Sequence, residues 1–373
     1  MKRSPIIAMA ITLAFSVALL ASPCLAQQQY LKNLIDASDK YINARNLWLV
    51  ADDSSWIPFV DSEKTKASQV VNGYLDRALA LLLDDSVIAS KDNIKGLYAK
   101  NKLLETEIAR LNLEKIAAPL EKKFYEVWKD TSDDMDKKIA GLRGQINKNK
   151  ALIDRQITGI SDQLANSKIN LSNDQVKTIF ISPSGEDQLN SIVVLKNIYA
   201  ICDVLKKAIA DGNDLSVNKK YYAVFLLATE AHKKQLETNL GNIESLYLPR
   251  LARLQEDNQA LMSQTRDRAA DNPKYETNLI AQQQTQEVSE KFKDLLKNQG
   301  AIILDRLKAL EDIIQFTDNT YQTVDLASSL SDSMSQSANS LLALLEMPIM
   351  PPIDFENSLE SKFLEISEKI NAN

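Results

Sequence analysis

The amino-acid sequence predicts an all-α protein, an elongated bundle of long antiparallel helices with coiled-coil-like packing. Two observations lead to this prediction. Glycine and proline are scarce, with nine and ten in 373 residues, and apolar residues recur every three or four positions over long stretches. Because this spacing aligns apolar side chains along one helix face, it favours long helices that pair through narrow stripes.

Three apolar stripes are visible, and each is interrupted by one polar residue. They run over residues 135–164, 236–261 and 303–324, and the interruptions are Asn149, Asn258 and Thr317. A polar residue buried in a helix pair commonly fixes the register, so these three are candidate register-setting residues. The alternative, that these faces are partly solvated, stays open. The first two stripes have matching spacing, which predicts that they pair with each other.

Turn-forming residues place the helix ends. We expect an αα-hairpin from helices 28–50 and 61–83, then either one kinked helix or two helices over 91–167, and further helices at 186–210, 217–270, 275–346 and 355–370. Ser172 to Gln175 has capping-box spacing, and Ser182 to Gly185 forms a turn. Between them, Val176 to Ile181 is the one predicted strand. The domain prediction is a signal peptide over 1–26, an N-terminal hairpin over 27–90, a long-helix bundle over 91–346, and a proline-rich turn with a C-terminal helix over 347–373.

The first 26 residues have the pattern of an export signal. Lys2 and Arg3 precede an uncharged apolar run over residues 6–21, and small residues stand at the positions before a cleavage point after Ala26. A lipid anchor on Cys24 is the rival interpretation, but Pro23 stands where lipoproteins carry a small residue. The sequence therefore predicts an exported protein, periplasmic in preference to secreted, with no transmembrane segment after signal cleavage.

The charge pattern argues against a nucleic-acid partner, and the cysteine content argues against an internal disulfide. The chain has 44 basic and 50 acidic residues, a formal charge of −6, which loss of Lys2 and Arg3 takes to −8. Basic clusters interleaved with aromatic residues are missing from the sequence, so we expect no nucleic-acid partner. Cleavage would leave Cys202 as the one cysteine, which excludes an internal disulfide and indicates a small buried apolar residue.

The sequence nominates no catalytic, cofactor-binding or metal-binding residue. Its one histidine, His232, lies between charged residues, which predicts a solvated surface position, and one histidine with one cysteine cannot make an ordinary zinc site. The acidic group from Asp130 to Asp136 lacks the spacing of a calcium loop and is more typical of a helix start. We therefore expect no cofactor and no enzymatic activity.

One serine-rich segment is a candidate contact with a partner or a membrane. This segment, residues 328–345, has Asp332 as its single charge. It ends in a run of leucines and is followed by a proline-rich turn. Core packing is the interpretation that we favour, because small side chains permit close helix approach. The candidate contact residues are Ser328, Leu341, Leu342, Leu345 and Ile349.

The combined pattern predicts an exported helical binding or scaffold protein that acts through protein–protein contacts or self-association. The alternative comes from the layout of an export signal followed by very long helices. In that layout the chain resembles the α-helical pore-forming toxins of the cytolysin A type, which implies a membrane-active protein with a concealed apolar hairpin. Membrane contact is then expected in the segment from Ser328 to Ile353.

Overall fold

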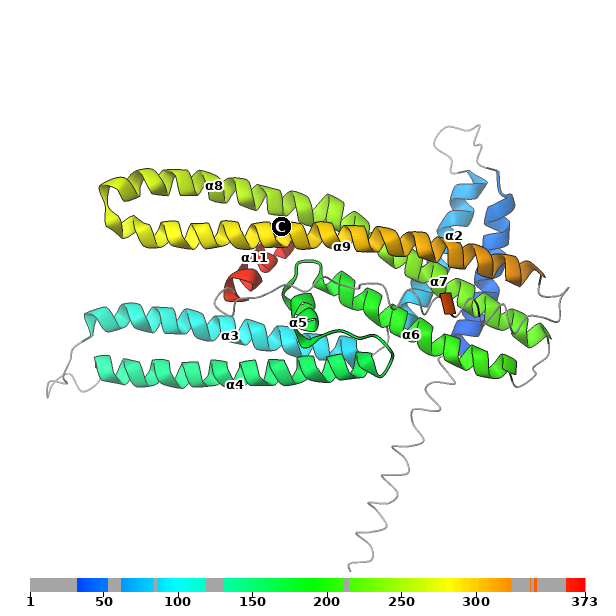
Figure 1. The fold of residues 1–373 in the computed structure, drawn as a ribbon, viewed down its shortest axis with the longest axis horizontal. Coiled ribbons are helices and arrows are strands. Elements are labelled where there is room, and N and C mark those ends of the chain that lie inside the picture. The colour runs from blue at the N-terminus through cyan, green and yellow to red at the C-terminus, as the bar shows by residue number, and fades with distance from the viewer. Residues whose placement is uncertain are drawn as a thin grey trace, which may run out of the picture. The chain divides into compact units, whose positions relative to one another are not determined.

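The structure, a computed structural model, describes residues 32–52, 62–83, 86–118, 131–210, 215–323, 336, 339–340 and 360–372. Within this part the regular elements are all helices and no strand occurs, which confirms the all-α prediction. The helices are one over residues 32–50, α2 (Glu63–Leu82), α3 (Ser86–Ala117), α4 (Ser132–Ala165), α5 (Asn173–Ile181), α6 (Gly185–Ala210), α7 (Leu215–Asn242), π-helix η1 (Ile243–Tyr247), α8 (Leu248–Asp271), 3-10 helix η2 (Pro273–Tyr275), α9 (Glu276–Thr323) and α11 (Glu360–Ala372) (Figure 1).

The chain divides into two compact units, each built from segments that are distant in sequence. Unit 1 comprises residues 1–84, 197–236 and 306–346, and unit 2 comprises residues 85–196, 237–305 and 347–373. Helices α6, α7 and α9 contribute residues to both units.

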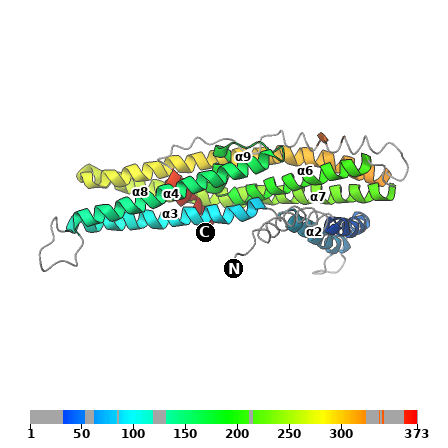
Figure 2. The same cartoon turned by 90° about the horizontal axis from the view of Figure 1, so that it is seen from below.

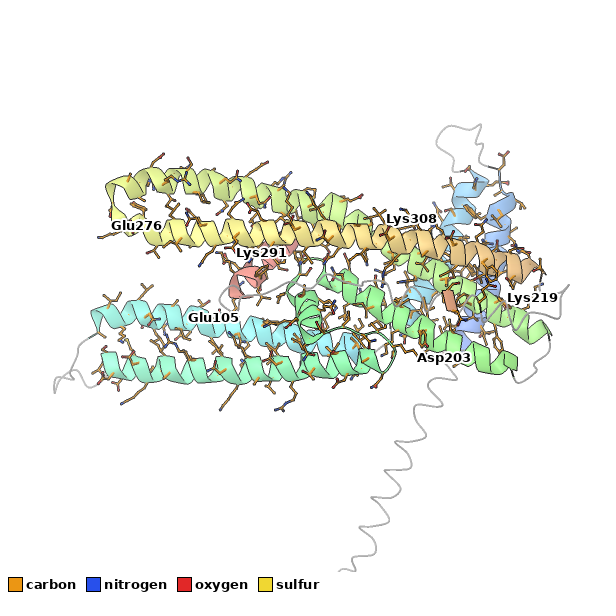
Figure 3. All side chains as sticks on the ribbon, viewed as in Figure 1. Glu105, Asp203, Lys219, Glu276, Lys291 and Lys308 are labelled. Carbon is orange, nitrogen blue, oxygen red and sulfur yellow. The ribbon has the colours of Figure 1, made fainter. Side chains whose placement is uncertain are left out.

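In unit 2, α3 and α4 form an antiparallel pair, side by side in Figures 1 and 2. Asn149 Nδ2 donates to Asn101 Oδ1 at 2.8 Å, and the Lys115 ammonium pairs with Asp136 at 2.6 Å. The higher residue number on α3 is therefore paired with the lower one on α4, as in an antiparallel pair. Side chains fill the space between the two helices (Figure 3). Of the two predicted arrangements for residues 91–167, the pair of helices is therefore the correct one.

The predicted stripe on α4 is buried almost throughout. It includes Ile139, Ile153 and Ile160 as well as Asn149, and only Leu142 on the stripe is half exposed. The helix begins with a capping box, in which Thr131 and Asp134 exchange side-chain and backbone hydrogen bonds. The predicted pairing of this stripe with residues 236–261 was wrong, because α4 packs against α3. Periodicity identifies the face of a helix but not its partner.

A second antiparallel pair in unit 2 joins α8 and α9, with η2 and Glu276 at its turn (Figure 3). Asn258 Nδ2 donates to the Gln282 carbonyl oxygen at 2.9 Å, and Gln282 Nε2 donates to Thr265 Oγ1 at 3.0 Å. The predicted stripe fails at Leu261, which is 52% exposed, while Met262 is half buried. Leu251 and Asn258 keep their predicted buried positions, so the deviation from the stripe begins after Asn258.

The predicted strand at residues 176–181 was wrong, because this segment belongs to α5. The predicted capping box is present there: Ser172 Oγ accepts from the Gln175 N–H, and Gln175 Oε1 accepts from the Ser172 N–H. It starts a helix whose Val176, Ile179 and Phe180 are all buried, among α3, α4 and α11. A short apolar run that is buried on most sides has the same sequence pattern in a helix as in a strand. Here the capping box at Ser172 is the signal that indicates a helix.

In unit 1, an ionic network joins the helix over 32–50 to α7 and α9. Arg45 Nη1 donates to Asp318 at 2.8 Å, and its Nε lies 3.5 Å from Glu230. Burial raises the pKa values of Tyr41 and Glu230, which lie in this network. On α2, Asp76 pairs with Lys234 of α7 at 2.6 Å. These polar bonds fix how the helices of unit 1 are oriented, while their apolar side chains form the buried core.

His232 is buried, which contradicts the prediction of a solvated surface position. Its exposed fraction is 1%, because α7 is covered nearly all round over residues 222–232. Burial, together with the nearby Arg306 charge, lowers the pKa of His232 to about 3. Cys202 is buried, as predicted. Charged sequence neighbours point in other directions from the helix and so do not report the exposure of His232.

In the described part of the chain, no helix is both long and apolar enough to cross a membrane.

Acid should destabilise unit 1 through His232. The unfolded chain binds a proton at the ordinary histidine pKa of 6.5 and the folded chain at about 3, so stability is lost as pH falls between these values. From pH 7 to pH 4 the loss amounts to about 3 kcal/mol from this residue. Thermal unfolding of the wild type and His232→Leu as a function of pH checks this prediction. Parallel pH dependence of the two proteins would contradict it.

Candidate functional site

A hollow of about 750 Å³ lies in unit 2, where α3, α11 and η1 meet the turn between α5 and α6. We call it the α5–α6 hollow. Its walls are mainly apolar, and a few charged and hydroxyl groups reach it from separate helices. The residues that line it include Lys91, Lys95, Tyr98, Ile179, Phe180, Ser182, Pro183, Gly185, Glu186, Asp187, Tyr247, Leu364, Ser367 and Glu368. This composition is typical of a binding site.

The turn from Ser182 to Gly185 shapes one wall of the hollow, and Gly185 makes this turn possible. The Gly185 N–H donates to the Ser182 carbonyl oxygen at 3.1 Å. A Cβ atom on Gly185 would lie 1.7 Å from the Ile179 carbonyl oxygen, closer than any real contact. The end of α5 and the start of α6 can therefore approach this closely only because residue 185 has no side chain.

Buried polar groups hold the turn from beneath. Ser184 Oγ donates to Gln299 Oε1 of α9 at 2.7 Å and accepts from Gln188 Nε2 at 2.8 Å. Asn239 Nδ2 donates to the Asp187 backbone carbonyl oxygen at 2.9 Å. These bonds tie the first turn of α6 to α7 and α9, so its side chains present a fixed arrangement to the hollow.

Two adjacent carboxylates of that first turn differ in environment. Glu186 pairs with the ammonium groups of Lys91 at 2.9 Å and Lys95 at 3.0 Å, and the hydrogen bonds from both lower its pKa. Asp187 Oδ2 accepts from Asn242 Nδ2 and from the Tyr247 hydroxyl, each at 3.0 Å. Burial raises the pKa of Asp187, because these neutral donors and no cation offset its desolvation.

Tyr247, which bonds to Asp187, lies in the π-helix η1, and Pro249 accounts for this wide turn. Pro249 has no N–H and its ring would clash with the carbonyl of Ser245 in a regular α-helix. The chain widens instead, and the Leu248 N–H bonds to the Ile243 carbonyl oxygen. Such single wide turns within helices often occur at functional sites.

The arrangement can bind, but its described residues do not form a nucleophile with an adjacent base. Ser182 and Ser184 bond to each other and to amides, while His232 belongs to unit 1. Among the described residues, no group of three or more histidine, cysteine or carboxylate side chains is placed to hold a metal ion. Hydrogen-bond acceptance and charge pairing at Asp187 are the chemistry that the hollow offers.

The candidate register-setting residues occupy separate helix contacts. Asn149 pairs with Asn101, and Asn258 bonds to the Gln282 backbone across α8 and α9. Thr317 is fully buried, but its hydroxyl donates to Ile313 of its own helix at 2.7 Å. All three side chains are buried, although their stripes include the partly exposed Leu142 and the exposed Leu261, and their register-setting role stays a prediction. The candidate contact residues Ser328, Leu341, Leu342, Leu345 and Ile349 lie outside the described residues.

The sequence analysis missed Glu186, Asp187 and Tyr247. Two signals pointed toward them: an acidic pair directly after the turn at Pro183, and a proline, Pro249, within an otherwise helical pattern. Neither signal says that the two segments meet, because about 60 residues separate them.

No protein-family model, curated protein or solved structure matches the chain.

Two glycine substitutions should have opposite effects. Gly185→Ala should destabilise the protein by about 1 to 3 kcal/mol, because the new methyl group collides with backbone that cannot rotate away. Gly144→Ala, in the exposed middle of α4 where a Cβ meets nothing within 4 Å, should stabilise it by about 0.5 to 1 kcal/mol. Chemical denaturation of both variants checks the pair. Equal tolerance of both would contradict the close approach at Gly185.

Proposed function

We propose that the chain is an exported, non-catalytic binding or scaffold protein that acts through protein–protein contacts. The observation that supports this proposal is the α5–α6 hollow, which combines mainly apolar walls with fixed polar groups on a helical frame. Concave, mainly apolar sites with a few placed polar groups are typical of ligand recognition. The export-signal pattern predicted in residues 1–26 supports the proposed export.

Surface beyond the hollow favours a protein as the ligand. Ala99 of α3 lines the hollow, and Leu103, four residues further along and therefore on the same side of α3, is 72% exposed. A small molecule would leave this leucine in water, whereas a protein that covers the rim could bury it. Burial of one large apolar side chain contributes about 1.5 to 3 kcal/mol, enough to alter affinity by tenfold or more.

The proposal predicts a partner whose affinity depends on Leu103. The purified protein is used to capture cross-linked partners from the exported fraction, and each captured protein is then purified and titrated against it. Leu103→Lys should weaken binding of the true partner about tenfold or more, because a charged side chain replaces buried apolar surface.

Leu113→Lys is the matched control. Leu113 is 71% exposed on the same helix, ten residues or about 15 Å further along, so the same change there should leave affinity unaltered. Equal effects of the two changes, or capture of nothing that binds after purification, would contradict the proposal. Dye release from liposomes by the protein would instead favour the pore-forming alternative.

A further inference from the structure

A second hollow, of about 660 Å³, lies in unit 2 where α8 meets α9 and α11. We call it the α8–α11 hollow, and it shares no lining residue with the α5–α6 hollow. Thr285 of α9 and Lys369 of α11 contribute to its walls, and α8 supplies the rest. Spacings of three and four residues place the α8 members on one face of that helix. They are Arg250, Arg253, Leu254, Asp257, Asn258 and Leu261.

Within the described residues, neither arginine of this hollow is in an ion pair. Arg250 Nη1 donates to the Ile370 backbone carbonyl oxygen at 2.8 Å, a neutral acceptor that holds the guanidinium group in place. Arg253 is exposed, and Asp257, one helix turn further along, does not pair with it. A guanidinium group has five N–H donors. Most donors of the two arginines are therefore available to a ligand.

The lysine and the acid of the hollow leave an excess of positive charge. Lys369 and Lys362 share one carboxylate, Glu365, at 2.7 Å and 3.0 Å, so together they contribute one positive charge. Of the described carboxylates, only Asp257 lines the hollow, and it offsets one more cation. With both arginines included, the excess is two positive charges.

Neighbouring acids on the same helices do not remove this excess. Glu256 of α8, Glu287 and Glu290 of α9, and Glu368 of α11 are absent from the lining. Glu287 and Glu368 are already in ion pairs with lysines that lie outside the hollow. The charge of the hollow is therefore set by its own side chains, and it favours an anionic ligand.

The neutral polar side chains of the hollow use their donors within the fold. Asn258 Nδ2 donates to the Gln282 carbonyl oxygen, and the Thr285 hydroxyl donates to the Ala281 carbonyl oxygen, each at 2.9 Å. The donors left for a ligand are therefore the cationic groups. Guanidinium groups match the geometry of carboxylates, with which they form paired hydrogen bonds.

Apolar surface beside the cations favours a segment of protein over a small anion. Leu254 is half buried and Leu261 is 52% exposed, and both line the hollow. Seven residues, or about 10 Å, separate them along α8. A small anion at the arginines would leave Leu261 in water, whereas an extended segment can bond to the arginines and cover this leucine.

We propose that the α8–α11 hollow binds an acidic segment of a partner protein, whose carboxylates bond to Arg250 and Arg253 while an apolar side chain packs on Leu261. This inference rests on the proposed function, that the chain acts through protein contacts, and adds a contact surface separate from the α5–α6 hollow. The chain as a whole carries a charge of −6. At about 0.1 M salt the Debye length is about 10 Å, so the charges at the hollow itself dominate the interaction.

The test is calorimetric titration of the full protein with two blocked pentapeptides at about 0.1 M salt. One peptide carries a leucine and two glutamates separated by one residue, and the other has glutamines in place of the glutamates. The glutamate peptide should bind about fivefold tighter or more, because charged hydrogen bonds to the guanidinium groups exist only there. Arg253→Gln should remove most of this preference while thermal unfolding shows that the fold is kept.

Arg266→Gln is the matched control. Arg266 is exposed on the same helix, thirteen residues or about 20 Å further along, and does not line the hollow. This change should retain the preference for the glutamate peptide. Asp257→Asn removes the carboxylate of the hollow and should tighten binding of the glutamate peptide several-fold, because the hollow becomes more positive.

Several outcomes would overturn the inference. The two peptides could bind equally, or neither could bind at millimolar concentration. Arg253→Gln and Arg266→Gln could behave alike, or Asp257→Asn could weaken binding of the glutamate peptide. Inorganic phosphate or succinate that binds as tightly as the glutamate peptide would show that the hollow takes a small anion instead. A captured partner that depends on Leu103 but not on Arg253 would overturn this inference and leave the proposed function intact.

Discussion

The paired helices α3 with α4 and α8 with α9 each bury a narrow apolar stripe, and the rest of unit 2 depends on how these stripes pair. Burial of the stripe supplies most of the stabilisation, because isolated helices gain little from propensity alone. An apolar stripe is repetitive, however, and permits several registers. The buried side-chain bond between Asn149 and Asn101 loses its partner if the helices slip by one turn, so we expect it to disfavour alternative registers that apolar contacts would tolerate.

Register matters because the α5–α6 hollow is assembled from several helices. Tyr98 comes from α3, Asp187 from α6, Tyr247 from η1 and Leu364 from α11. A slip of one turn in a helix moves its residues by about 5.4 Å, which would break the 3.0 Å contact between Tyr247 and Asp187. The geometry of the hollow is therefore a consequence of helix pairing elsewhere in unit 2.

The sequence predicted the helical class, the α4 stripe with Asn149 upon it, and the capping box at Ser172, because each depends on local spacing. It failed where tertiary burial decides: His232 is in the core despite charged neighbours, and residues 176–181 form a helix. Leu261 is exposed, outside its predicted stripe. The hollow could not be predicted, since Asp187 and Tyr247 meet only after α6 and η1 have packed. Neither an acidic pair nor a proline in a helix specifies that contact.

The most direct test of this account is the register of α3 against α4. In a background with Cys24→Ala and Cys202→Ala, Asn101→Cys with Asn149→Cys should be joined efficiently by a thiol cross-linker shorter than two helix turns, because these residues face each other. Asn101→Cys with Leu164→Cys should not, because Leu164 lies fifteen residues, or about 22 Å, further along α4. Both yields are read from peptide mass spectra. Equal yields, or a higher yield for the second pair, would contradict the pairing on which the hollow depends.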